Sequence, residues 1–149
     1  MAKISKFELR LTSSVGVSYL DIVIDNHPLV TYFAVLRRAI PNEVSPLGGP
    51  STEQHNRQQF RRFLLEEPPD LPGGRNSILL CGCGDLACGA YSAIFTREGE
   101  LIRWSEFGYE STLGEEISTP EIPTPSLVPT LLFSWEQYEA ELRRRLTGV

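Results

Sequence analysis

The most reactive side chains of this sequence are its three cysteines, all of which lie between Cys81 and Cys88. On a strand, Cys81 and Cys83 point to the same face about 7 Å apart, and Cys88 could fold back toward them across a glycine turn. Three thiolates supply most of a tetrahedral zinc site. The sequence therefore gives Cys81, Cys83 and Cys88 as candidate metal ligands, with zinc as the candidate cofactor. The fourth ligand would have to be a water or one of three side chains: Asp85, His27 or His55.

Two other interpretations of the cysteine segment stay open. Cys83 with Cys88, or Cys81 with Cys83, could form a redox couple, although thiol–disulfide enzymes favour C-x-x-C at a helix start, where the helix dipole lowers the thiolate pKa. The flanking residues here predict strands instead. Free cysteine is also among the most buried residue types, and a zinc ribbon would need a second pair of cysteines. We therefore favour a structural role in a tightly packed hairpin over zinc or redox chemistry.

Other catalytic signatures are absent or incomplete in the sequence. Gly82-x-Gly84-x-x-Ala87 matches a dinucleotide-binding pattern, but the residues after it predict a strand where that site needs a helix N-terminus. The phosphate-binding Gly-x-x-x-x-Gly-Lys loop and the Gly-x-Ser-x-Gly elbow of serine hydrolases are both missing. His27 is interpreted as a neighbour of a helix cap and His55 as a solvated side chain. We therefore predict no catalytic and no cofactor-binding residue.

The acidic residues of the chain gather in one stretch. The formal net charge is −5, which disfavours broad binding to nucleic acid or to an anionic membrane surface. Between Glu106 and Glu121 there is no basic residue, and Pro120, Pro123 and Pro125 stiffen the end of the stretch. Such a surface could steer a basic partner protein into contact. The candidate partner-binding residues are Glu106, Glu110, Glu115, Glu116 and Glu121.

Length and composition are those of one globular domain. The chain has 149 residues, of which 41% are hydrophobic and 22% are charged, enough to bury a core without disulfide staples. Its N-terminus lacks the apolar region of a signal peptide, and its apolar runs are far shorter than the roughly 20 residues of a membrane span. We therefore expect a cytoplasmic protein that does not enter a membrane.

The N-terminal third predicts a β-hairpin followed by a helix. Apolar and polar residues alternate in 7–11 and again in 20–24, which is typical of paired strands with one buried face. Asn26-His27-Pro28 has the pattern of a helix start, with Asn26 or His27 as the cap and the proline at the first helical position. Helical spacing of apolar residues then predicts a helix that ends before Pro41.

Two capping boxes predict two more helices. Ser51 with Gln54 opens a helix to about Glu67, and Ser134 with Gln137 opens the C-terminal helix. The first helix is expected to turn Phe60, Phe63 and Leu64 inward and Arg57, Arg61 and Arg62 largely outward. The second is expected to place Trp135, Tyr138, Leu142 and Leu146 on one face and to carry the ion pairs Glu139–Arg143 and Glu141–Arg145.

Between these helices the sequence predicts a β-rich region. The apolar run 76–83 is typical of a central strand buried on both faces, and 90–96 and 101–107 predict a hairpin with a turn at 97–100. Residues 110–129 carry four prolines and predict an acidic surface loop. The sequence thus predicts a single α+β domain over 1–149, with a mainly antiparallel sheet of about five strands and about three helices.

Three motifs in the C-terminal half resemble a group of bacterial proteins with no assigned activity. These motifs are Cys81-x-Cys83-Gly84 with Cys88-Gly89, then Trp104-Ser105-x-Phe107, then Phe133-x-Trp135-x-x-Tyr138. The group shares a C-x-C-G-x-x-x-C-G hairpin, a W-x-x-F strand end and a closing helix with an inward tyrosine. The resemblance implies a shared fold and supplies no functional site.

Two functions from different classes follow from these residues. The first is a non-enzymatic protein-binding module, immunity-like or regulatory, that engages a basic partner through its acidic stretch. The alternative is a metal- or thiol-dependent enzyme, or a zinc-binding protein, centred on Cys81, Cys83 and Cys88. We favour the binding module, because the cysteines lack both a clear fourth ligand and an activating helix.

Overall fold

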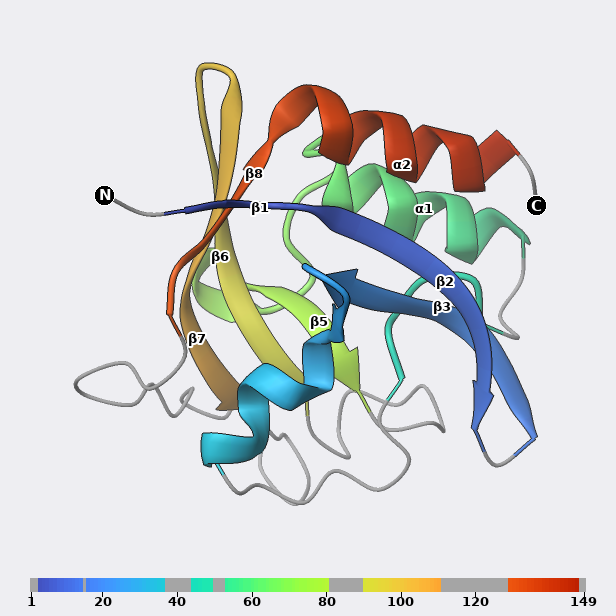
Figure 1. The fold of residues 1–149 in the computed structure, drawn as a ribbon. Coiled ribbons are helices and arrows are strands. Elements are labelled where there is room, and N and C mark those ends of the chain that lie inside the picture. The colour runs from blue at the N-terminus through green and yellow to red at the C-terminus, as the bar shows by residue number, and fades with distance from the viewer. Residues whose placement is uncertain are drawn as a thin grey trace.

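The computed structural model describes residues 3–14, 16–36, 44–49, 53–80, 90–110 and 129–147. Figure 1 shows the course of the chain through its strands and helices. The strands are β1 Ile4–Ser5, β2 Phe7–Ser14, β3 Val17–Ile24, β4 His27–Pro28, β5 Asn76–Leu80, β6 Ala90–Glu98, β7 Leu101–Glu110 and β8 Leu131–Ser134. The helices are α1 Glu53–Phe63 and α2 Trp135–Thr147, with 3₁₀ helices at Leu29–Leu36 and Pro72–Gly74.

The strands form two sheets. One has five strands in the order β1-β8-β7-β6-β5, and the other has three in the order β2-β3-β4. Within the larger sheet β1 runs parallel to β8 while the remaining neighbours are antiparallel, so the sheet is mixed. The α+β class is confirmed. The predicted mainly antiparallel sheet of about five strands is confirmed only in part, because the eight described strands are divided between a mixed five-stranded sheet and a separate three-stranded sheet. The predicted three helices are replaced, among the described residues, by two α-helices and two short 3₁₀ segments.

The predicted helix after residue 26 is wrong over its first residues. Asp25 and Asn26 have φ angles of 51° and 68°, the left-handed pair of a tight hairpin turn that these two residue types tolerate. The chain therefore folds back, and His27 and Pro28 pair with Ile24 and Val23 as strand β4. A 3₁₀ helix follows as far as Leu36, and residues 37–40 lie outside the described residues. His27 is thus a strand residue and not the neighbour of a helix cap.

Helix α1 is shorter than predicted. Its capping residue Ser51 lies outside the described residues, and the helix ends at Phe63. The backbone N–H of Glu66 donates to the carbonyl of Arg61 at 2.8 Å and that of Leu65 to Arg62 at 3.1 Å, which closes the last turn. Leu65 occupies the left-handed position of this cap, with φ of 63°, where glycine is usual and other residues lose about 1 kcal/mol.

The inward directions predicted for the three apolar side chains at the end of this helix are confirmed. Phe60, Phe63 and Leu64 are buried. Of the arginines, Arg57 and Arg61 are exposed as predicted, but Arg62 is only 2% exposed. The prediction that Arg62 points outward is therefore wrong, because its guanidinium forms buried hydrogen bonds inside the fold.

Strand β5 is buried as predicted but is not central. All five of its residues are buried, yet the strand lies at the end of the described sheet, beyond β6. Its last residue, Leu80, is covered by Val44, with which it exchanges two backbone hydrogen bonds of 2.8 Å. The apolar run correctly predicted that both faces of the strand are buried. It could not predict the position of the strand in the sheet, because a covered edge strand is buried in the same way as a central one.

The C-terminal helix is confirmed, with one change in its ion pairs. The N–H of Gln137 donates to Ser134 Oγ at 3.4 Å, and Tyr138 and Leu142 are fully buried. The pair Glu139–Arg143 forms at 3.1 Å. The predicted pair Glu141–Arg145 does not form, because Glu141 pairs with Arg144 at 2.7 Å while Arg145 donates to the backbone of β2.

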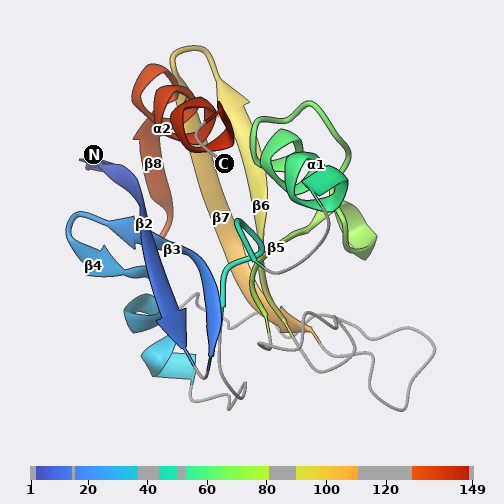
Figure 2. The same cartoon turned by 90° about the vertical axis from the view of Figure 1, so that its right-hand side faces the viewer.

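Aromatic side chains join the two sheets and the two helices in one core. Trp104 of β7 lies at its centre, and the rings around it come from β2, α1, β6, β8 and α2: Phe7, Phe63, Phe95, Phe133 and Tyr138. The Tyr138 hydroxyl donates to the Phe63 carbonyl at 2.7 Å and ties α2 to the end of α1. Burial raises the pKa of Tyr138, so this donor keeps its proton. Figure 2 views both helices nearly end-on, beside the larger sheet.

Candidate functional site

Most of the residues predicted to carry function fall outside the described part of the chain. The candidate metal ligands Cys81, Cys83 and Cys88 do so, as do Glu115, Glu116 and Glu121. The zinc, redox and packing interpretations of the cysteines therefore stay predictions. The described residues contain no group of three or more His, Cys, Asp or Glu side chains that could hold a metal ion. They also include no helix long and apolar enough to cross a membrane.

The strand register brings the described residues that flank segment 81–89, and the residue before segment 111–128, to one end of the larger sheet. Leu80 of β5 pairs with Ala90 of β6, and Ala90 pairs with Glu110 of β7. The three residues thus lie in one row across three neighbouring strands. Segment 81–89 connects the first two of them, and segment 111–128 starts from the third. The cysteine segment and the acidic stretch, which the sequence places apart, therefore leave the sheet from the same end.

Aromatic rings support this end of the sheet. Tyr91, one residue from the row of strand ends, stacks on Phe33 with ring centres 4.4 Å apart. Tyr109 and Phe107 meet this pair edge-on, at 5.7 Å from Tyr91 and 5.6 Å from Phe33 respectively. Edge-to-face and stacked contacts of this kind add to the burial energy of the rings. The acidic stretch is therefore attached to a firmly packed platform.

A bulge in β7 presents the first glutamate of the acidic stretch. Glu106 and Phe107 together oppose Ala93, because the register shifts between Ser92 and Ile94 of β6. Glu106 takes a left-handed φ of 52° and is exposed, whereas Phe107 is fully buried. Glu106 thus points away from the core. The backbone of Glu110 lies in β7, and its side chain is outside the described residues.

A buried arginine that the sequence did not reveal holds this bulge in place. Arg75 is 3% exposed and donates from Nε to Ser92 Oγ at 2.9 Å. Its Nη2 donates to the carbonyl of Glu106. A guanidinium bound to both strands of the bulge fixes the register at which Glu106 leaves the sheet. The sequence offers no signal for this role, because the partners lie on strands that only the fold brings together.

A second buried arginine joins helix α1 to strand β5. Arg62 donates through Nε and Nη2 to Gln59 Oε1 at 3.0 and 2.5 Å, and through Nη1 to Asn76 Oδ1 at 3.1 Å. Its Nη2 also donates to Ser77 Oγ at 3.2 Å, and Asp70 lies 3.4 Å from Nη1. Burial lowers the pKa of Arg62, and the Asp70 carboxylate opposes that change. Helical periodicity could not predict this network, because most of the partners lie 8 to 15 residues further along the chain.

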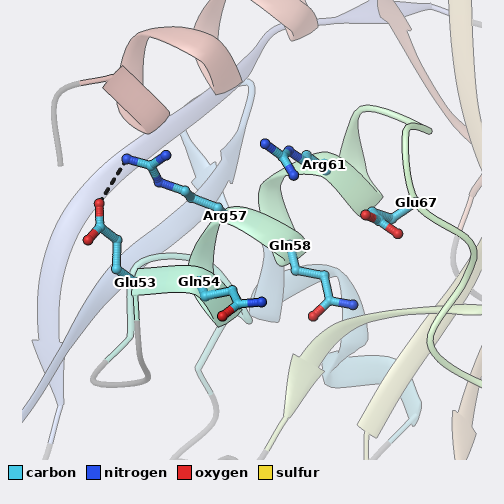
Figure 3. Close-up of a pocket in the computed structure, with 6 residues that line it drawn as sticks. All are labelled: Glu53, Gln54, Arg57, Gln58, Arg61 and Glu67. Atoms are coloured by element: carbon cyan, nitrogen blue, oxygen red, sulfur yellow. Dashed lines mark hydrogen bonds and ion pairs between the residues drawn. The ribbon is translucent and has the colours of Figure 1, made fainter.

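The outer face of α1 carries a shallow polar hollow of about 630 Å³ (Figure 3). Arg57 donates to Glu53 one helical turn away at 2.8 Å, and both side chains are exposed. Such exposed pairs contribute little free energy, and none of the six lining residues is buried. We therefore interpret the hollow as a solvated helix face. Its lining residues are Glu53, Gln54, Arg57, Gln58, Arg61 and Glu67.

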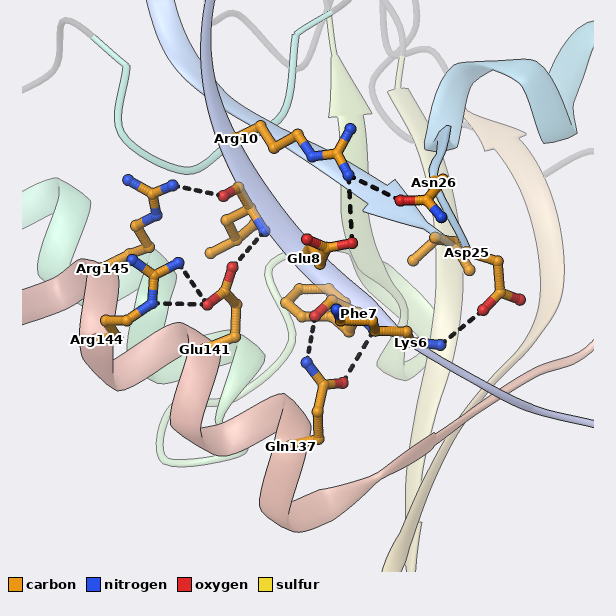
Figure 4. Close-up of polar contacts among 12 residues, drawn as sticks. Lys6, Phe7, Glu8, Arg10, Asp25, Asn26, Gln137, Glu141, Arg144 and Arg145 are labelled. Atoms are coloured by element: carbon orange, nitrogen blue, oxygen red, sulfur yellow. Dashed lines mark hydrogen bonds and ion pairs between the residues drawn. The ribbon is translucent and has the colours of Figure 1, made fainter.

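Helix α2 covers the free edge of β2 with side chains (Figure 4). Gln137 accepts from the N–H of Phe7 at 2.9 Å and donates to its carbonyl at 2.5 Å. One turn later Glu141 accepts from the N–H of Leu9 at 2.8 Å, and Arg145 donates to the Leu9 carbonyl at 2.8 Å. Four helical residues rise about 6 Å and two strand residues about 6.6 Å, so the two spacings match. The side chains take the place of a neighbouring strand.

No family model, no curated protein and no solved structure matches this chain. The resemblance of the three C-terminal motifs to a bacterial group therefore stays a prediction.

Proposed function

We propose that this protein is a non-enzymatic protein-binding module that engages a basic partner at the acidic end of its sheet. We define the acidic end by the five glutamates of the acidic stretch: Glu106, Glu110, Glu115, Glu116 and Glu121. The observation that carries the proposal is the common row of Leu80, Ala90 and Glu110, from which segments 81–89 and 111–128 both depart. Long connections held by a rigid scaffold are where binding surfaces are usually built.

Charge gives this surface its expected partner. Five carboxylates without an intervening cation attract a positively charged protein over distances of about one Debye length, roughly 10 Å at 0.1 M salt. Attraction of this kind raises the association rate and selects partners by charge more than it adds affinity. A partner with a basic active site, which the acidic end would occlude, fits this chemistry. The role is then that of an immunity-like or regulatory protein.

The scaffold beneath the acidic end holds its one described side chain, Glu106, in a fixed position. Arg75 fixes the bulge from which Glu106 projects, and Tyr91 packs against Phe33 beside the strand ends. A residue held in place before binding loses less conformational entropy when the complex forms. The packing around Glu106 therefore favours specific binding over loose electrostatic adhesion.

Site-specific photo-crosslinking in cell lysates adjusted to low and high salt tests the proposal. A photoreactive residue at position 106 is expected to trap a basic protein, and the yield of that adduct should fall at raised salt. Replacing all five glutamates of the acidic end by glutamine should reduce the yield at least tenfold. The matched control replaces five exposed glutamates elsewhere, which changes the net charge equally: Glu53, Glu66, Glu98, Glu100 and Glu136. Equal losses from the two variants, or an adduct with an acidic protein, would refute the proposal.

A further inference from the structure

An exposed leucine occupies a position where the backbone favours glycine. Leu65 follows α1 with a left-handed φ of 63°, and its side chain is 40% exposed. Neither the backbone conformation nor the exposure is what an apolar side chain prefers. Strain that the fold retains at an exposed residue is a reason to look for a function nearby.

Leu65 forms one wall of a recess of about 390 Å³ between the end of α1 and strands β5 and β6. The lining also includes the ring of Phe95, which stacks on Trp104 with ring centres 4.6 Å apart and planes within 4°. Because Trp104 is fully buried, this ring is held in place by the core. The recess is lined by Arg62, Leu65, Glu66, Glu67, Pro68, Pro69, Asn76 and Phe95.

Arg62 lines the recess but has no hydrogen left for a ligand. Its five N–H groups face Gln59, Asn76, Ser77 and Asp70, each of which supplies an oxygen. An anion entering the recess would therefore find no free guanidinium donor there. The positive charge of Arg62 is also balanced by Asp70 at 3.4 Å.

Asn76 supplies a free donor at the bottom of the recess. Its Oδ1 accepts from Arg62 at 3.1 Å, and because a guanidinium can only donate, this contact fixes the orientation of the amide. The Nδ2 group must then point away from Arg62, and it donates to no other residue in the described ranges. Asn76 is only 2% exposed, and that small exposure leaves its Nδ2 group in contact with the water of the recess. A ligand carbonyl could take the place of that water as the acceptor.

The rim of the recess is acidic. Glu66 is bound to Arg143 at 2.7 Å, whereas Glu67 makes no ion pair with any residue of the described ranges. Glu67 also lines the hollow on α1, where Figure 3 shows it, so its carboxylate lies between the two depressions. A positively charged group leaving the recess on this side would meet an uncompensated carboxylate.

From these features we propose that the recess binds a lysine side chain within an extended segment of a partner protein. The carbonyl of that segment accepts from Asn76 Nδ2, and the aliphatic stem of the lysine packs between Leu65 and Phe95. The ammonium group then reaches Glu67, in the manner of long basic side chains that bury their stem and keep the charge in water. Phe95 lies five residues along β6 from Ala90, about 16 Å, so this site is separate from the acidic end and does not depend on it.

Small capped amino acids test the site by NMR titration of the full chain. The probes are N-acetyl-lysine N-methylamide, the norleucine analogue that has the stem without the charge, and the glutamate analogue. The lysine probe is expected to shift the amide signals of Leu65, Asn76 and Phe95 and to bind at least fivefold more tightly than the norleucine probe. Absence of these shifts, or equal binding of the lysine and glutamate probes, would overturn the proposal.

Two variants separate binding from folding. Glu67→Gln is expected to reduce the affinity for the lysine probe to that for norleucine while leaving norleucine binding unchanged. Leu65→Gly removes the apolar wall and suits the left-handed backbone, so it should weaken both probes about tenfold while the melting temperature stays at or above that of the unmodified protein. The control is Leu11→Ala, because Leu11 is a 71% exposed leucine on β2 outside the recess. If neither Glu67→Gln nor Leu65→Gly lowers the affinity, the recess is not the binding site.

Discussion

Strands β2 and β5 each end a sheet, and side chains bind backbone groups on the outer edge of both, in addition to the backbone bridge between Val44 and Leu80 at the end of β5. On β2 the cover comes from α2, where Gln137, Glu141 and Arg145 bind the backbone of Phe7 and Leu9. On β5 Asp70 accepts from the N–H of Ser77 at 2.9 Å and from its hydroxyl at 2.6 Å. Exposed strand edges invite association with other chains, and both covers remove that hazard.

The two covers differ in how deeply their charges are buried. The β2 cover uses half-buried side chains at the surface of α2, so water can replace a lost partner. The β5 cover depends on Asp70, which also neutralises Arg62, a residue 2% exposed. Removing one member of a buried pair leaves a charge that water cannot reach, and this costs far more than the pair contributes. Both covers protect a strand edge, but a substitution in the β5 cover should destabilise the fold more than one in the β2 cover.

The largest expected effect follows from removing the carboxylate of the β5 cover. Asp70→Ala should lower the free energy of unfolding by about 3 kcal/mol, because Arg62 keeps its charge without its acidic partner and Ser77 loses an acceptor. Urea denaturation measures the change. The matched control is Glu53→Ala, which removes the exposed acidic partner of Arg57 on the same helix and should cost less than about 0.5 kcal/mol. Similar losses in the two variants would contradict the contrast between the edges.

A smaller effect is expected at the β2 cover. Glu141→Ala removes the acceptor of the Leu9 N–H and should lower the free energy of unfolding by about 1.5 kcal/mol, the range of a hydrogen bond to a charged group. Glu139→Ala on the same helix removes only an exposed ion pair with Arg143 and should cost less than about 0.5 kcal/mol. Thermal unfolding followed by circular dichroism ranks the stabilities of the two variants. If Glu139→Ala is the less stable of the two, Glu141 does not stabilise the edge of β2 as described.

The smallest effects concern two aspartates of the three-stranded sheet. For Asp25, burial would raise the pKa, but the Lys6 N–H and the Ser5 and Lys3 side chains lower it below its ordinary value. Its contribution to stability is therefore present above the unfolded pKa near 4 and is lost as the pH falls through the lowered value. For Asp21 burial raises the pKa, so ionisation as the pH rises past the unfolded value weakens the fold.

Unfolding curves recorded between pH 2 and pH 7 distinguish these two aspartates. At pH 7 Asp25→Asn is expected to lower the free energy of unfolding and Asp21→Asn to raise it. Both differences should shrink toward pH 2, where each wild-type carboxyl is largely protonated. A pair of variants whose stabilities change in the same direction at pH 7 would show that the opposite pKa shifts have no bearing on the fold.

The elements that the sequence predicted correctly have a clear pattern among residues that are close together in the chain. Alternation in 7–11 and 20–24 matches the hairpin of β2 and β3, and the capping box at Ser134 matches the start of α2. The helix expected after Asn26 failed because asparagine and aspartate favour both helix caps and left-handed turns, so residue type alone could not separate the two. Strand β8, only Leu131–Ser134, was too short to give a pattern.

The candidate sites depended more on tertiary structure than on local sequence. Helical spacing cannot tell an exposed arginine from one whose partners arrive from a strand, and Arg62 is the second kind. The row of Leu80, Ala90 and Glu110 likewise exists only through strand register. Charge composition did predict an acidic surface, and the exposed Glu106 agrees with it over the described part of that stretch. The sequence thus predicted which residues are candidates for a site, but not where the fold places them.

The cover of β2 has a consequence for the order of events during protein synthesis. Gln137 and Phe7 are separated by 130 residues and Arg145 and Leu9 by 136, so the ribosome completes β2 long before it makes the residues that protect it. The hairpin can form early from local contacts. Its outer edge, however, waits for helix α2 to emerge. A nascent chain stalled before residue 137 would carry a finished hairpin with a bare edge, and the emergence of Gln137, Glu141 and Arg145 is the step that closes it.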